Sequence, residues 1–163
     1  MIFRIKKYFR AKKKNHFQDE LIEKLNKEHQ KLFELVEQMD EVIEKDDIKK
    51  IKKFLNVFKQ ELELHLLYED TNLYEHLYLR YSFYPEVKDA IKQKHEEIKN
   101  IGLAVGEFIN NHKDLQSVSA FKKDFEVIKQ VLVKRVEFEE EILYDIYATN
   151  HKIDKILLKL KKA

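Results

Sequence analysis

The chain of 163 residues is long enough for one domain, and 44% of its residues are hydrophobic, enough to bury a sizeable core. It contains no cysteine, which excludes disulfides, iron–sulfur clusters, thiolate metal sites and cysteine nucleophiles. Only two glycines and one proline occur, a composition that favours helices over strands. Since the sequence has neither a transmembrane run nor a secretory signal, we expect a cytoplasmic protein.

The formal net charge of +2 is unevenly distributed along the chain. Residues 1–14 hold seven Lys or Arg and no acidic residue, and we interpret residues 1–17 as a basic arm. Its apolar residues would let it lie on an anionic membrane surface or a protein partner, or pack against the rest of the chain. The remaining chain is mildly acidic and offers no element that reads a nucleic-acid groove, so we expect no nucleic-acid partner.

Apolar residues spaced three and four apart predict a helix over residues 19–45, with His29 on its buried stripe. The same spacing predicts a second helix over residues 47–81. His65 and Glu69 lie on or beside the buried face of this second helix.

Pro85 is typical of the first turn of a helix and opens a third predicted helix, to residue 111, which carries His95. After a polar loop over residues 110–117, a fourth helix is predicted to extend to residue 149, with Arg135 and Glu139 interrupting its apolar stripe. Short connections between long helices predict an all-α, up-down-up-down antiparallel four-helix bundle over residues 18–149.

Residues 150–163 form a basic amphipathic tail, because four apolar residues share one face of a helix. We expect the tail to extend the fourth helix and to pack against the bundle. These apolar residues are Ile153, Ile156, Leu157 and Leu160.

His65 and Glu69 are four residues apart, so they lie one turn apart on one helix face and can hold the same ion. Alone, this spacing is unspecific, because a buried histidine is usually a hydrogen-bonded core residue. The other predicted helices add ionisable residues near their midpoints, and their burial without partners would be costly. A metal or mutual ion pairing is therefore needed to hold them. The added residues are His29, His95, Glu139 and Glu140.

Two absences exclude other chemistries. None of the seven histidines has a glutamate three residues before it, which disfavours the two-metal carboxylate proteins of the ferritin-like class. Lys99 stands where a zinc-protease helix beginning at His95 needs its second histidine, and two glycines cannot form a phosphate-binding loop. An enzyme is not indicated.

Residues 19–146 resemble the hemerythrin-like, or HHE cation-binding, four-helix bundles. That family places a histidine on helix one, His-x-x-x-Glu on helix two, His-x-x-x-His or a variant on helix three, and a histidine followed by a carboxylate on helix four. The matching elements here are His29, His65 with Glu69, His95, and the segment Glu139-Glu140-Glu141-Ile142-Leu143-Tyr144.

The sequence departs from the family pattern at two ligand positions, where it has Lys99 and Arg135. In the family, two irons share the helix-two glutamate and the helix-four carboxylate. The resemblance implies that the second iron keeps only His95 of its own, so the reduced set favours one metal over two. The retained ligands would be His29, His65, Glu69 and Glu140, with Glu139 as the alternative to Glu140.

Lys99 and Arg135 together carry the charge of one divalent iron, so they could neutralise Glu69 and Glu140 in place of the second metal. Alternatively, both cationic side chains reach outward to solvent. The resemblance implies a non-haem iron protein that binds or senses a small diatomic ligand such as oxygen, or stores iron. The rival interpretation is a metal-free interaction or regulatory bundle in which Lys99, Arg135, Glu69 and Glu140 form a buried ion-pair network.

Overall fold

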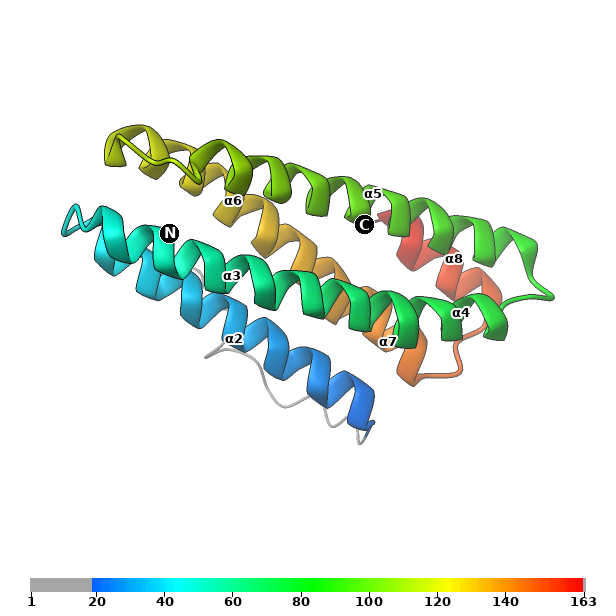
Figure 1. The fold of residues 1–163 in the computed structure, drawn as a ribbon. Coiled ribbons are helices and arrows are strands. Elements are labelled where there is room, and N and C mark those ends of the chain that lie inside the picture. The colour runs from blue at the N-terminus through cyan, green and yellow to red at the C-terminus, as the bar shows by residue number, and fades with distance from the viewer. Residues whose placement is uncertain (1–18, 163) are drawn as a thin grey trace.

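The computed structural model describes residues 19–162 of the chain (Figure 1). The basic arm predicted over residues 1–17 lies outside the described residues. Every regular element within residues 19–162 is helical, which confirms the predicted all-helical fold. None of the described helices is long and apolar enough to cross a membrane.

The first two helices begin at aspartate caps. The Asp19 carboxylate accepts a hydrogen bond from the backbone N–H of Leu21 at the start of α2 (Glu20–Ile43). Asp47 does the same for Lys50 at the start of α3 (Ile48–Glu69). Such caps satisfy backbone donors that have no partner within the helix, so local sequence chemistry sets both starting points.

Two of the long helices contain a π-helical turn. α3 continues through η1 (Asp70–Tyr74) into α4 (Glu75–Arg80), and α6 (Val118–Phe138) continues through η2 (Glu139–Leu143) into α7 (Tyr144–Ala148). Between them lies α5 (Pro85–His112), which has its proline in the first turn. A π turn inserts one residue into an α-helix and shifts the face presented by everything that follows; such turns are frequent at functional sites.

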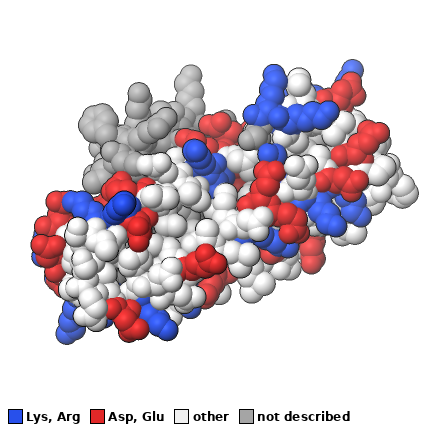
Figure 2. Space-filling model, turned by 90° about the horizontal axis from the view of Figure 1, so that it is seen from above, with Lys and Arg blue, Asp and Glu red and all other residues white. Residues whose placement is uncertain are grey.

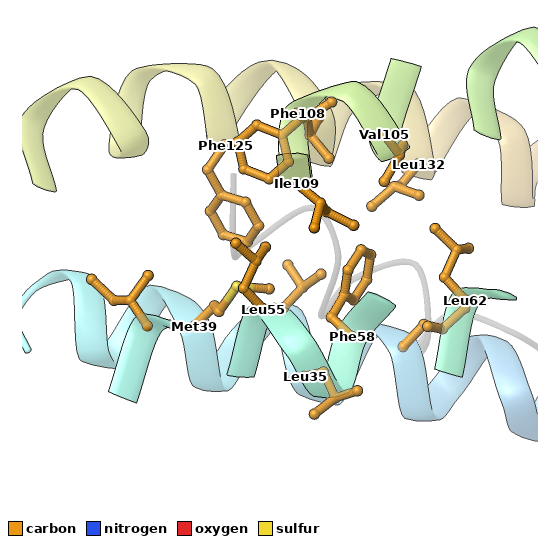
Figure 3. Close-up of a cluster of buried hydrophobic side chains, with 14 of the residues drawn as sticks. Leu35, Met39, Leu55, Phe58, Leu62, Val105, Phe108, Ile109, Phe125 and Leu132 are labelled. Carbon is orange, nitrogen blue, oxygen red and sulfur yellow. The ribbon is translucent and has the colours of Figure 1, made fainter. Parts of the chain in front are cut away.

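The helices form a bundle in which successive long helices run in opposite directions (Figure 1). α2 contacts α3, α3 contacts α5, α5 contacts α6, and α6 contacts α2. The interior holds two apolar clusters, one near each end. One cluster contains aromatic side chains of α3, α5 and α6, which point toward one another across the bundle (Figure 3). The other surrounds η1, α7 and α8.

The prediction that the C-terminal tail extends the fourth helix was wrong. The helix ends at Ala148, Thr149 is extended, and α8 (Ile153–Lys162) folds back onto α5. The Arg80 guanidinium donates to the carbonyls of Tyr147 and Thr149 at 2.6 and 3.2 Å. It thereby satisfies the last carbonyls of the helix and stabilises the break. The tail nevertheless packs against the bundle, because its apolar face is buried.

Acidic and basic side chains are interspersed over the face shown in Figure 2. Several form ion pairs one helical turn apart, such as Lys27 with Glu23 at 2.6 Å. Pairs of this kind at the surface contribute little to stability.

Gly106 lies within α5, and a methyl group added there would meet no heavy atom within 4 Å. We expect Gly106→Ala to raise the free energy of unfolding by about 0.5–1 kcal/mol, because alanine loses less backbone entropy in a helix. Gly102→Ala is the matched control, since its methyl group would meet Leu66 Cδ1 at 3.4 Å and the gain should be smaller. Urea denaturation measures both, and a lower midpoint for Gly106→Ala would contradict the expectation.

Candidate metal centre

A layer of buried ionisable side chains lies between the two apolar clusters. Each of its five central members is at most 4% exposed. They come from α2, α3, α6 and η2, so residues more than a hundred positions apart in the sequence meet at one level of the bundle. These residues are His29, His65, Glu69, Arg135 and Glu139.

The two histidines point the same nitrogen at each other. His29 Nε2 lies 3.2 Å from His65 Nε2 and 3.1 Å from Glu139 Oε2. One ligand atom from each of these residues lies within 4.8 Å of the others. Within residues 19–162, this trio is the group of histidine and carboxylate side chains that has the spacing of a metal site.

The other nitrogen of each ring is held by a carboxylate. His29 Nδ1 lies 2.8 Å from Glu140 Oε1, and His65 Nδ1 lies 3.0 Å from Glu28 Oε2. An ionised carboxylate only accepts hydrogen bonds, so protons on both Nδ1 atoms would satisfy these two contacts. The Nε2 lone pairs would then face each other at 3.2 Å, an arrangement that a cation between or beside them would stabilise. Carboxylate-held histidines are the usual pattern of metal-binding imidazoles.

The donor set and its spacing fit a metal ion. Two ligands about 2.1 Å from one ion, at angles between 90° and 110°, lie roughly 3.0–3.4 Å apart, as these atoms do. Two histidines and one carboxylate with open positions are typical of non-haem iron. In addition, Glu139 Oε2 and Glu69 Oε1 are buried and have no hydrogen-bond partner within the described structure. Such unsatisfied oxygens are costly, and a cation would satisfy them.

Arg135 occupies the neighbouring half of the layer. Its Nε donates to Glu139 Oε1 at 2.5 Å and its Nη2 donates to Glu69 Oε2 at 2.9 Å. The guanidinium therefore bridges two carboxylates from different helices. Its partners are Glu69 and Glu139, whereas the sequence interpretation paired it with Glu69 and Glu140. Lys99 is exposed and is not a partner of these carboxylates.

His95 lies outside the trio. Its Nε2 is 2.7 Å from Asp70 Oδ1, its Nδ1 is 2.6 Å from the Tyr78 hydroxyl, and its ring stacks on Tyr74 at 3.6 Å between centroids. Both ring nitrogens are thus engaged with protein groups. The structure therefore brings together His29, His65 and Glu139, with Glu69 beside them through Arg135. It places Glu140 behind His29, and metal binding by each predicted residue stays a prediction.

Comparison with known proteins identifies the family of the chain. The model of the hemerythrin HHE cation-binding domain matches residues 8–147, most of the chain. The chain belongs to this family. The recognition made from the histidine and carboxylate pattern is confirmed. No curated protein and no solved structure matches the chain.

In this hemerythrin-family chain, electrostatics keep the trio ready for a cation. Burial lowers the pKa of His29 to about 4, against the opposing effect of Glu139, so its imidazole is neutral at pH 7. Burial alone would raise the pKa of Glu139, but the Arg135 guanidinium and the two histidines lower it to about 2. Metal ligands must be neutral imidazoles and ionised carboxylates, and His29 and Glu139 meet these conditions. Burial and the nearby Glu139 raise the pKa of Glu69 well above its usual range.

The sequence interpretation missed two features of this hemerythrin-family site. One is the pair of π turns, which begin directly after Glu69 and at Glu139. The other is Glu28, the carboxylate partner of His65. The pattern Glu-x-x-x-Leu-Tyr spans both π turns, at Glu69 to Tyr74 and at Glu139 to Tyr144. It also occurs at Glu63 to Tyr68 within the regular α-helix α3, so it does not signal a π turn by itself.

Proposed function

We propose that this hemerythrin-family chain binds a single iron ion through His29, His65 and Glu139 and holds a small diatomic ligand, such as oxygen, at an open coordination position. Three protein ligands leave several positions of an octahedral iron open. Glu69, with one unsatisfied oxygen, is the next candidate for a ligand. The bound metal would supply the position at which the small ligand is held.

The observation that carries this proposal is the pair of histidine Nε2 atoms 3.2 Å apart, each with its Nδ1 held by a carboxylate. Hydrogen bonding within the protein holds both rings, and protons on the two Nδ1 atoms would leave the Nε2 lone pairs facing each other. The rest of the chain supports the same function, because apolar clusters lie on both sides of the layer and keep bulk water away. The two apolar clusters also support the predicted hemerythrin-like four-helix bundle, with the C-terminal tail packed against it.

One metal is favoured over two because Arg135 stands where the second metal of the family would share the bridging carboxylates. The guanidinium keeps its positive charge at all relevant pH values, so a change of pH does not release the two carboxylates for a second metal. A mode of oxygen binding in which oxygen takes electrons from two irons would need the second metal, so we do not propose it. A single site supports sensing or binding of the small ligand.

A rival function follows from the same arginine. The described structure satisfies much of the layer without any metal, since Arg135 pairs with Glu69 and Glu139 at short distances. A metal-free interaction or regulatory bundle would use this ion-pair network to hold its helices in register. Its stability would not respond to chelators.

The test is the iron content of protein purified with iron available, by elemental analysis, beside visible spectra before and after exposure to air. We expect close to one iron per chain. We also expect chelation to lower the free energy of unfolding, by about 4 kcal/mol if the site is saturated a thousandfold above its dissociation constant. Two irons would contradict the single-metal site. Folded protein with no iron and no response to chelator would favour the metal-free bundle.

A further inference from the structure

Two buried tyrosine hydroxyls near the metal centre have no hydrogen-bond partner within residues 19–162. Tyr74 and Tyr144 are each 1% exposed, and the Oη atom of each is unsatisfied. Buried hydroxyls are almost always hydrogen-bonded, because leaving one without a partner is costly. Two carboxylate oxygens, on Glu69 and Glu139, are also buried without a partner, and these four unsatisfied oxygens indicate a place built for a polar guest.

The π turns account for the position of both tyrosines. In an α-helix, a residue five positions after another is rotated by about 140° and faces elsewhere. In η2 the backbone N–H of Tyr144 instead bonds to the carbonyl of Glu139, so one π turn separates them. This connection brings the tyrosine close to the face of its glutamate, as a spacing of four does in an α-helix. η1 separates Tyr74 from Glu69 in the same way.

The surroundings place the two hydroxyls beside the same charges. Burial and then the carboxylates of Glu69 and Glu139 raise the pKa of both tyrosines, and Arg135 opposes this in each case. A tyrosine hydroxyl is protonated at neutral pH and is able to donate a hydrogen bond. The Tyr144 ring is nearly parallel to the His29 ring, with centroids 5.9 Å apart, so it borders the trio directly.

We propose that Tyr74 and Tyr144 donate hydrogen bonds to the small ligand held at the centre, and that they select ligands with an oxygen or nitrogen lone pair. This inference rests on the proposed function, because the ligand needs the metal. Each hydroxyl adds a directed donor to a site that lies between two apolar clusters, and directed donors discriminate strongly in a dry site. The cost of leaving them unsatisfied in the empty protein is recovered when the ligand is present.

The probe is azide, a small anion with accepting nitrogen atoms, titrated into iron-loaded protein and followed in the visible spectrum. We expect Tyr74→Phe and Tyr144→Phe each to weaken azide binding by about tenfold, as for the loss of one hydrogen bond to a charged acceptor. Iron content should stay as in the unmutated chain. Tyr81→Phe is the control, because Tyr81 is buried in the same apolar cluster and should leave azide binding unchanged.

A second readout needs no metal. Both substitutions should leave the thermal midpoint of chelated protein equal or raised, because they remove an unsatisfied hydroxyl and keep the ring. A fall of several degrees in both would overturn the inference, since it would mean that the hydroxyls have partners in the empty protein.

The outcomes separate the two ideas. Iron bound in both variants with unchanged azide affinity would overturn the role of the tyrosines and leave the proposed function standing. Loss of iron from the variants would make the tyrosines part of the metal site and would also overturn it. Absence of iron from the unmutated chain would remove the proposed function first and this inference with it.

Discussion

Arg135→Met is expected to lower the free energy of unfolding of the metal-free protein by about 3–5 kcal/mol. Methionine fills a similar space without a charge, so Glu69 and Glu139 would remain buried at 1% and 0% exposure without their cation. Removing one partner of a buried ion pair costs far more than the net worth of the pair. Urea denaturation in the presence of a chelator measures the effect.

Lys134→Met is the matched control, because it removes a positive charge from the adjacent, exposed residue of α6. It should change stability by less than about 0.5 kcal/mol. A loss below about 1 kcal/mol for Arg135→Met would mean that the guanidinium does not hold the two carboxylates together.

Arg135→His tests the same position for metal chemistry. An imidazole is a ligand and a guanidinium is not, and the two carboxylates it would share are already in place. We expect the metal content to rise from about one toward two per chain. An unchanged metal content would count against the idea that Arg135 substitutes for a second ion.

Substitutions in the run Glu139-Glu140-Glu141 are expected to give graded effects on metal binding. Glu139→Gln should weaken iron binding by more than about 100-fold, because it removes the carboxylate within 3.1 Å of His29 Nε2. Glu140→Gln should weaken it by about 10–100-fold, because Glu140 holds His29 Nδ1 at 2.8 Å and acts through the histidine. Competition with a metallochromic indicator measures both.

Glu141→Gln is the control within this run, since Glu141 is exposed and the substitution changes the same charge. Its iron affinity should be that of the unmutated chain. The series also decides between Glu139 and Glu140, of which the sequence interpretation favoured Glu140. A larger loss for Glu140→Gln than for Glu139→Gln would reverse the assignment and support the ligand set expected from the family resemblance.

The position of His95 illustrates the limit of pattern recognition. Its place on the buried stripe of the third predicted helix matches the family, and the helix itself is present as α5. Its ring nitrogens nevertheless bond to Asp70 and Tyr78, both contributed by the π turn and the helix after it. Nothing in the periodicity of α5 reports which groups a neighbouring helix offers.

The sequence by itself determined the helices, their caps, the burial of the histidines and the family. These properties depend on contacts within a few residues or on the periodicity of apolar side chains, which a single helix already expresses. His65 and Glu69 share a face for this reason.

Only the tertiary structure decided which carboxylate lies beside the Nε2 atom of His29 and which side chains Arg135 contacts. Adjacent residues of a helix point about 100° apart, so the choice between Glu139 and Glu140 depends on how α6 is rotated against α2 and on the π turn that starts there. That rotation is set by the packing of both apolar clusters at once, and no local pattern encodes it. The same packing places Arg135 between carboxylates of two helices.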